Sequence, residues 1–381
     1  MTKARENELL LSIARREVRE LQVPSQLDWD YVLATARAHR LLPLLQKHLV
    51  HTTDGVVPGH VLSSLKREAV ANSQSVLHLV AKQLRVYQLF KEHGIPVAIF
   101  KGALLAQMAY GEMSLRQAGD IDVLIDVRDF AQARVLLETL GYEMTPRLTA
   151  TQLASHLSNH CEMQFMRDDW FTIVDLHWDL APRSFVFGLK GEEVMSRLQS
   201  VALAGATVET FGVEDLLLYQ AMHGAKHLWR RLEWIAALAE SVRATPAIDW
   251  DAIVSRAANA HATRMLALAL RLIEEFSDVK VPVITSLDKD ATMQRLAREI
   301  RAQIFDTSGT PVSTETNLYN LRIMDRKRDA LVSALRSIFV PTLPDWQALA
   351  LPSSLHSLYY AYRPLRLSKV YALSVLSNLR R

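Results

Sequence analysis

Residues 94–142 read GIPVAIFKGALLAQMAYGEMSLRQAGDIDVLIDVRDFAQARVLLETLGY. The apolar run Pro96–Phe100 ends at Lys101-Gly102, a pattern that predicts a short buried strand closed by a tight turn. A helix is expected over residues 103–109, directly behind the glycine. The stretch therefore begins as a strand that leads straight into a helix.

The second half of the stretch alternates strictly over Asp120–Val127, which predicts a second strand. Apolar residues occupy one face, namely Ile121, Val123, Ile125 and Val127, and the other face carries Asp120, Asp122, Leu124 and Asp126. We expect Asp126 to cap the helix that follows, in which Phe130, Ala133, Leu137 and Leu140 share a face before Gly141. One face of the strand is core, and the other carries carboxylates.

A hairpin is expected further on, with strands near residues 162–167 and 171–178 joined at Asp168-Asp169. In its second strand Asp175 and His177 share one side. Strand, helix, strand, helix and hairpin together predict a mixed α/β module of about 110 residues.

The paired aspartates of the second strand indicate a cation site. Asp120 and Asp122 are two residues apart on a strand, so they project the same way, about 6.5–7 Å apart. Carboxylates this close suit one hard cation or two bridged ones, and leaving them buried and unpaired costs several kcal/mol. Asp175 would supply a third carboxylate if its strand neighbours theirs.

Lys101-Gly102 predicts a phosphate site beside these carboxylates. It ends a strand and opens a helix, where backbone N–H groups hold phosphate and glycine permits close approach. Lys101 or Arg116 would stabilise the phosphates further, and His177 either positions substrate or is an ordinary hydrogen-bonded histidine. Taken together, these residues describe a site for metal and triphosphate.

Composition excludes several classes of protein. The 381 residues are 49% hydrophobic and carry a net charge of +3, which is typical of a folded globular protein and too balanced for a dedicated nucleic-acid binder. The single cysteine, Cys161, is expected to be a small buried hydrophobe, and it and the polar start favour a reducing cytoplasm. The most apolar candidate span, Trp346–Tyr362, contains Pro352 and His356 and will not cross a membrane.

Helical segments are expected on both sides of the mixed module. We divide the chain into an N-terminal helical segment (1–72), the α/β domain (73–205) and a C-terminal helical domain (206–381), with one long helix over Ser73–His93. The basic, aromatic tail from Tyr359 would dock on anionic lipid or a partner, or pack within the molecule. Since Pro364 interrupts it, intramolecular packing is favoured.

One predicted helix carries a basic face formed by His223, Lys226, His227 and Arg230. Three interpretations stay open, namely contact with phosphates, ordinary surface or core packing, and a zinc site. The zinc interpretation is weakened because Gly224 stands where the catalytic glutamate of a His-Glu-x-x-His motif belongs.

Residues 94–142 resemble the bacterial family of uncharacterised nucleotidyltransferases in the polymerase-beta-type superfamily. The pieces VDLHW (174–178), LYQAMHGAKHLW (218–229) and YYAYRP (359–364) are similar to that family as well. The likeness runs from about Val32 to the end, and only the first block is specific. It implies an α+β fold, a polymerase-beta-type mixed-sheet domain flanked by helical segments.

The resemblance also implies roles for individual residues. Gly102 becomes the phosphate-loop glycine, Asp120 and Asp122 the paired metal ligands, and Asp175 the third carboxylate, which helps to activate the acceptor hydroxyl. Lys-Gly stands where the superfamily usually has Gly-Ser, and the gap from Gly102 to Asp120 is longer than usual.

The activity implied is transfer of a nucleotidyl group from a nucleoside triphosphate to a hydroxyl, assisted by two Mg²⁺ ions, with release of pyrophosphate. The acceptor is a metabolite, a sugar or a peptide, and the oligomeric state is not predicted. Two other hypotheses are a non-catalytic scaffold that keeps the fold and binds nucleotide, and antitoxin-like binding of a partner protein.

Overall fold

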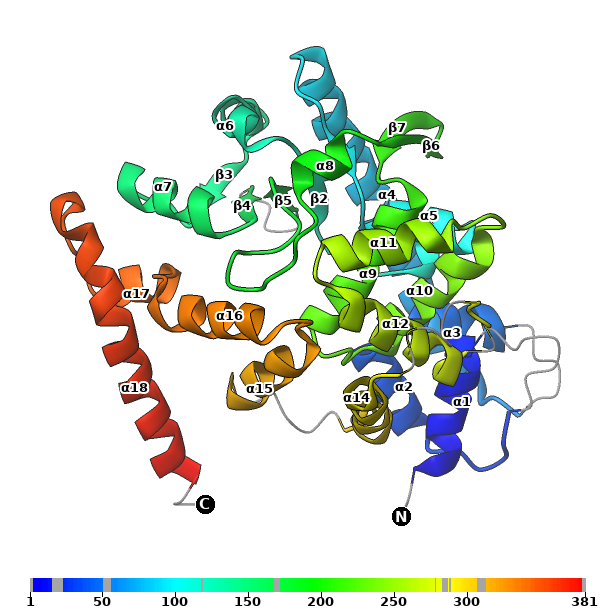
Figure 1. Ribbon diagram of the computed structural model, residues 1–381. Helices are drawn as coiled ribbons and strands as arrows, with labels where there is room; N and C mark the ends of the chain where they lie inside the picture. The colour runs from blue at the N-terminus through cyan, green and yellow to red at the C-terminus, as the bar shows by residue number, and fades with distance from the viewer. Residues whose placement is uncertain are drawn as a thin grey trace.

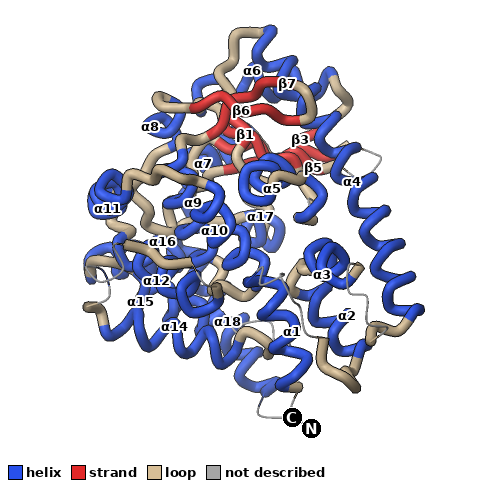
Figure 2. Tube along the Cα trace, turned by 90° about the vertical axis from the view of Figure 1, so that its right-hand side faces the viewer, coloured by secondary structure: helices blue, strands red, loops and turns tan. Residues whose placement is uncertain are grey.

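Among the described residues the strands β1–β7 gather at one end of the molecule, and helices joined by loops make up most of the remainder (Figure 2). The computed structural model describes residues 3–15, 23–50, 56–117, 119–167, 172–277, 279–282, 287, 289–306 and 313–378. In Figure 1 the sheet lies in the upper half, helices α9–α12 below it, and α15–α18 form an arm at the left. The fold is therefore the mixed α+β class that the sequence predicts.

The main sheet has five strands in the order β1-β2-β5-β4-β3. Their bounds are β1 (Ala98–Ile99), β2 (Ile121–Leu124), β3 (Glu143–Thr145), β4 (Glu162–Met166) and β5 (Ile173–His177). Strands β2 and β5 run parallel and the other neighbours antiparallel, so the predicted mixed sheet is confirmed. A second sheet pairs β6 (Gln199–Leu203) with β7 (Ala206–Thr210).

The local predictions around this sheet hold except at the end of the second strand. Strand β2 ends at Leu124 and the chain turns into a short 3-10 helix at Val127, so the prediction that Val127 faces the core is wrong and its side chain is exposed. Strand β1 leads through Lys101 into helix α5 (Gly102–Tyr110), and the short η1 (Met113–Leu115) follows. Asp126 accepts a hydrogen bond from the N–H of Arg128 and caps η2 (Val127–Asp129), which runs into helix α6 (Phe130–Thr139). The hairpin β4–β5 forms as expected, although its predicted turn lies in residues 168–171, outside the described residues.

Strand β2 is buried on both faces. Ile121 and Val123 face the core between the sheet and α6, as predicted. Leu124, on the carboxylate face, is also fully buried, because it belongs with Phe100 to a second core built from the later helices. The carboxylate face of β2 therefore lies under the helical part of the chain.

The N-terminal helices share this second core with the helices that follow the sheet. Their bounds are α1 (Ala4–Arg15), α2 (Trp29–Ala38), α3 (Leu42–Leu49) and α4 (Gly59–Glu92). Helix α1 packs on α10 (Leu232–Ala244) and α12 (Thr263–Phe276), and both views show them side by side (Figures 1 and 2). Helix α4 starts earlier than predicted and runs through the proposed boundary at residue 72, so the division into three units stays a prediction.

The remaining helices complete the chain. Their bounds are α7 (Ala150–Asn159), α8 (Gly191–Met195), α9 (Val213–Lys226), α11 (Trp250–Asn259), α14 (Ala291–Gln303), α15 (Ser313–Ile323), α16 (Lys327–Phe339), α17 (Leu343–Ala348), η3 (Ser353–Leu358) and α18 (Tyr359–Asn378). In the part of the chain that the structure describes, no helix combines the length and apolar character needed to cross a bilayer.

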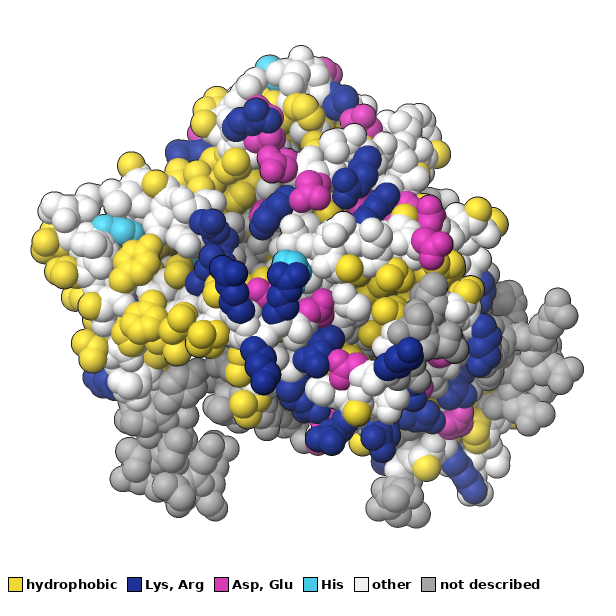
Figure 3. Space-filling view, in the orientation of Figure 1, with side chains coloured by type: hydrophobic (Ala, Val, Ile, Leu, Met, Phe, Trp, Pro, Cys, Tyr) yellow, Lys and Arg dark blue, Asp and Glu magenta, His cyan; other side chains and the backbone are white. Residues whose placement is uncertain are grey.

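The basic tail is tied to the molecule by ion pairs, as favoured above. Arg363 and Arg366 both bind the carboxylate of Asp345, which is fully buried. The expectation that Pro364 interrupts this segment is wrong: α18 runs through it. Pro364 lies near the helix start, so its ring disturbs only the first turn, and the two arginine contacts hold both sides of it. Exposed apolar side chains gather over this arm, at the left of Figure 3.

A buried histidine joins the N-terminal helices to α10. The Nδ1 atom of His39, at the end of α2, accepts a hydrogen bond from the N–H of Leu232 at 3.3 Å. Burial, together with the charge of Arg231, lowers the pKa of His39 to about 4. His39 is therefore neutral in the folded protein at neutral pH.

We expect His39 to make the fold acid-sensitive. Its folded pKa lies below the unfolded value, so the unfolded chain binds the proton first and stability falls as the pH drops from about 6.5 to 4, by about 3 kcal/mol. Urea unfolding at pH 7.5 and 4.5 of the wild type and His39→Gln measures this. The other histidines contribute equally to the pH dependence of both proteins, so the difference between the two proteins reports His39. An equal pH dependence of the unfolding free energy in both proteins would contradict the prediction.

Candidate active site

Two aspartates lie side by side at the centre of the sheet. Strands β2 and β5 are parallel, and their register pairs Asp122 with Asp175. Both residues are buried, at 3% and 8% exposure. A carboxylate oxygen of each and a ring nitrogen of His177 all lie within 4.8 Å of one another. The sheet thus brings together two carboxylates that are 53 positions apart in the sequence (175 − 122).

Asp175 has an oxygen without a partner. Its Oδ1 is buried and makes no hydrogen bond within the described structure. Burial, followed by the charges of Asp122 and Asp120, raises the pKa of Asp175 to about 7. A buried carboxylate oxygen costs free energy when it has no donor or cation. The nearest ammonium, that of Lys101, donates to Asp122 and leaves this oxygen of Asp175 without a donor.

Asp120 precedes β2 and sits at the mouth of the cluster. Its side chain keeps much of its surface open to solvent, and its oxygens lie outside the group that comes within 4.8 Å. Neighbouring protein atoms desolvate its carboxylate and, with the charge of Asp122, raise its pKa. The structure thus places all three predicted aspartates in one electrostatic cluster, with Asp120 on the solvent side.

Lys101 reaches from the strand-to-helix turn into this cluster. Its Nζ donates to Asp122 Oδ1 at 2.7 Å and lies 5.2 Å and 5.7 Å from the ring centroids of Phe100 and Tyr219. Gly102 opens α5 at φ +58°, in the left-handed region that favours glycine. Burial alone would raise the pKa of Asp122, but Lys101 and the hydrogen bond from His177 hold it well below its usual range.

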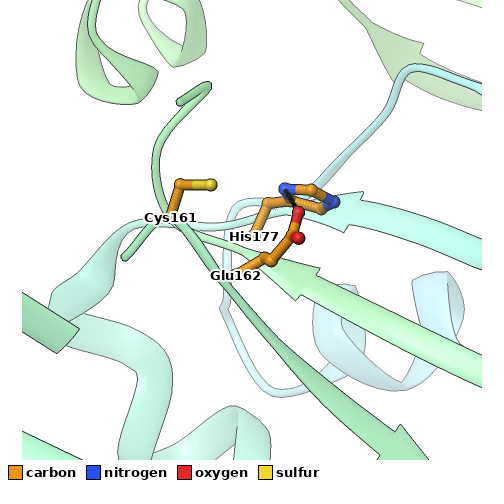
Figure 4. Close-up of side chains that lie close together, drawn as sticks. All are labelled: Cys161, Glu162 and His177. Atoms are coloured by element: carbon orange, nitrogen blue, oxygen red, sulfur yellow. Dashed lines mark ion pairs between the residues drawn. The ribbon is translucent and has the colours of Figure 1, made fainter. Parts of the chain in front are cut away.

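His177 connects the cluster to a fourth carboxylate. Its Nε2 hydrogen bonds to Asp122 Oδ1 at 2.9 Å. Its Nδ1 lies 3.2 Å from Glu162 Oε2 and makes no hydrogen bond within the described structure. Figure 4 shows Glu162 and the thiol of Cys161 beside this ring. Cys161 is buried as predicted, and burial raises the pKa of its thiol to about 12.

Sequence reasoning missed Glu162. The residue begins β4, and the strand register pairs it with His177. The hairpin was predicted, so aligning its two strands would have pointed to this residue. The length of the turn between the two strands is uncertain by a residue or two, so their pairing could not be fixed from the sequence. A shift of one residue in this pairing turns each side chain to the other face of the sheet.

Helix α9 brings His223 and Lys226 of the predicted basic face to the site, and His227 is its C-cap. The prediction that Arg230 shares this helix face is wrong, because the helix ends at Lys226 and the chain turns at Leu228 and Trp229, which have positive φ. The ring of His223 lies 5.9 Å from that of Tyr219 and 4.7 Å from that of His227. Trp234 of α10 covers both histidines, at 5.5 Å and 5.4 Å. Burial, then neighbouring lysines, lower the pKa of His227 to about 4 and that of His223 well below normal, so both rings are neutral. The charge on this face comes from Lys226.

The described residues offer no third ligand for a zinc ion at His223 and His227. The groups of side chains close enough to share an ion are Asp122, Asp175 and His177, and Cys161, Glu162 and His177. Neither group includes a residue of α9. The two rings instead stack among Tyr219 and Trp234.

Arg116 is held by another acid. Its guanidinium is nearly buried and pairs with Glu233 of α10. This pair ties the loop before β2 to the helical part of the chain. Binding of phosphate by Arg116 stays a prediction, since the pair with Glu233 already uses one edge of its guanidinium.

The acidic cluster suits a divalent cation. Its donors are carboxylate oxygens, which hard cations such as Mg²⁺ prefer. The partnerless Oδ1 of Asp175 and the like charges around it fit a cation held there. Asp120, Asp122 and Asp175 are the residues that would hold it.

The chain thus combines a mixed sheet, a strand-to-helix turn at Lys101-Gly102 and aspartates on the neighbouring strands β2 and β5. Residues 25–278 match the model of a family described as uncharacterised nucleotidyltransferase, and the chain belongs to this family. The resemblance stated from the sequence is thereby confirmed.

A solved structure, that of the antibiotic-resistance factor ANT(2'')-Ia in solution, also matches. It shares 12% identity with this chain at a TM-score of 0.28, and the match covers 61% of this chain and 96% of that one. No curated protein matches the chain.

Proposed function

We propose that this protein transfers a nucleoside monophosphate group from a nucleoside triphosphate to a hydroxyl acceptor and releases pyrophosphate. The observation that carries the proposal is the pairing of Asp122 with Asp175 on parallel strands, beside the lysine and glycine of a strand-to-helix turn. A site built of carboxylates, one cation and free helix amides is suited to a metal-bound phosphate chain.

In the proposed reaction the acceptor oxygen attacks the α-phosphorus. The new bond joins that oxygen to the α-phosphorus, and the bond from this phosphorus to the oxygen bridging to the β-phosphate breaks. Pyrophosphate leaves with that electron pair. The hydroxyl proton passes to Asp175, whose Oδ1 has no other hydrogen-bond partner in the described structure.

The acidic residues and His177 divide the remaining work. Asp120, Asp122 and Asp175 would hold two Mg²⁺ ions, which when bound neutralise the charge that develops on the phosphates. His177 hydrogen bonds to the Asp122 carboxylate and would fix its orientation, with Glu162 close to the other ring nitrogen. Since the ring is buried, it acts by positioning Asp122.

Residues around the aspartates would bind the phosphates. Lys101 reaches the cluster from the strand-to-helix turn, and the first amides of α5 would add donors there. Lys226 lies close enough to lower the pKa of Glu162 together with His177. His223 and His227, being neutral, would donate or accept hydrogen bonds. The proposed setting is the cytoplasm, and the acceptor is a metabolite, a sugar or a peptide.

The test is to incubate the protein with Mg²⁺ and each of the four nucleoside triphosphates labelled at the α-phosphate, with pools of sugars, metabolites and peptides as acceptors. We expect label in a product and release of pyrophosphate with the wild type. With Asp120→Ala both signals should fall by about 10²-fold or more, because a cation ligand is lost.

Two results would decide otherwise. Tight nucleotide binding with no labelled product from any pool would favour the non-catalytic scaffold. Equal product from the wild type and Asp120→Ala would show that the aspartate cluster does not support the reaction.

A further inference from the structure

Two segments far apart in the sequence meet beside the acidic cluster. The hydrogen bond from the Leu232 N–H to His39 joins the end of α2 to the start of α10, across 193 positions, and both residues are buried. Arg40 and Arg231 are the next residues on either side of this bond. The contact therefore fixes two arginines on neighbouring pieces of backbone.

Arg40 occupies a backbone position that normally favours glycine. Its φ is +55°, and the N–H of Leu41 bonds the carbonyl of Ala36 at 2.8 Å, the pattern that ends a helix with a left-handed residue. A side chain other than glycine or asparagine costs about 1 kcal/mol or more in this conformation. The Arg40 side chain therefore stays at a position where glycine would be less strained.

The two guanidiniums lack acidic partners. Within the described residues neither Arg40 nor Arg231 forms an ion pair with a carboxylate. Arg231 stacks on Trp234 at 5.2 Å, and Glu233, the acid beside it in the sequence, is bound by Arg116. Burial and the charge of Arg40 lower the pKa of Arg231. Two like charges held together in this way are stabilised by an anion between them.

The location of the pair suggests which anion. Arg231 lies over the ring of Trp234, which covers His223 and His227 on the helix that faces Lys101. Arg40 lies on the backbone that the bond from Leu232 to His39 holds next to Arg231, so the pair borders the cluster. A triphosphate whose α-phosphate sits at the aspartates would extend its other two phosphates outward from them. These phosphates need cations that the aspartates do not already use.

We infer that Arg40 and Arg231 bind the β- and γ-phosphates of the nucleoside triphosphate, and hold the same groups as pyrophosphate after transfer. The inference rests on the proposed function. It gives the N-terminal helices a part in the site and explains why Arg40 keeps a strained backbone. It also predicts that the site distinguishes triphosphates from monophosphates through these two side chains.

The experiment measures binding without turnover. Calorimetric titrations with inorganic tripolyphosphate and with a nucleoside monophosphate, in buffer of fixed Mg²⁺, compare the wild type with Arg40→Gly, Arg231→Gln and the double variant. We expect each single change to weaken tripolyphosphate binding about tenfold and the double change more, because each removes charge-assisted hydrogen bonds. Binding of the monophosphate should change less than twofold.

Arg40→Gly guards against a folding artefact. Glycine relieves the strain at φ +55°, so this variant should unfold at a higher temperature than the wild type while it binds tripolyphosphate less well. Arg37→Gln, which removes an exposed arginine from the same helix, is the matched control and should bind like the wild type.

Unchanged tripolyphosphate binding in the double variant would overturn the inference, as would an equal loss for both ligands. If the double variant loses tripolyphosphate binding but the wild type transfers no nucleotide, the anion site stands and the proposed function fails. If transfer occurs and the double variant binds tripolyphosphate normally, only the anion site fails.

Discussion

Replacing Asp175 by asparagine is expected to lower nucleotidyl transfer by about 10³-fold, because a cation ligand and proton acceptor is lost while the shape of the site is kept. In metal-free buffer the same change is expected to raise the unfolding temperature. The carboxylate of Asp175 is buried beside Asp122 with one oxygen unpartnered, so neutralising it relieves repulsion. Lower activity together with a higher unfolding temperature is expected of a residue that supports activity at the expense of stability.

Asp126→Asn is the matched control. Asp126 lies just beyond β2, the neighbouring strand, and its side chain caps η2, a role that asparagine fills equally well. Its ion pair with the exposed side chain of Arg128 contributes little. Its transfer rate should stay within twofold of the wild type. If Asp175→Asn keeps more than a tenth of the activity, or if it is markedly less stable without metal, the assigned role of Asp175 is wrong.

Replacing Gly224 by alanine is expected to destabilise the protein by about 2–3 kcal/mol, although alanine normally favours a helix by about 1 kcal/mol over glycine. A Cβ at this position would lie 2.5 Å from Cζ2 and Cζ3 of Trp229, whose ring is fully buried. Trp229 packs there because the turn after α9 places it and Leu228 at positive φ. The ring has nowhere to move, so the turn itself must shift.

A second substitution tests this explanation. In a Trp229→Leu background the added methyl group meets no ring, so Gly224→Ala should then cost little or become stabilising. Urea unfolding of the four proteins in this cycle measures the coupling between the two sites. Equal costs in both backgrounds would show that the contact with Trp229 is not the reason for the glycine.

The sequence allowed the central part of the site to be predicted, because its signals are local. The alternation over Asp120–Val127 and the lysine-glycine turn follow from neighbouring residues. Strand β1 and helix α5 form where expected, and β2 forms within the predicted stretch but ends earlier, at Leu124. Asp175 was placed through a family resemblance and a predicted hairpin. The parallel register that puts it against Asp122 comes from the structure.

What escaped prediction depends on contacts across the chain. Glu162 enters through a strand register that was open by a residue. Arg40 reaches the site through a hydrogen bond between segments 193 positions apart. Gly224 was considered only as a missing glutamate, whereas its role is to make room for a ring five residues later. These contacts leave no periodic pattern in the neighbouring sequence, so they could not be predicted from it.

The hydrogen bond from Lys101 to Asp122 has a consequence for assembly of the protein. The ammonium of Lys101 already offsets part of the negative charge of the aspartates. We therefore expect the protein to fold without a bound metal ion. Chelators should then abolish turnover while leaving the unfolding temperature nearly unchanged, and an incoming ion has to compete with an amine for Asp122.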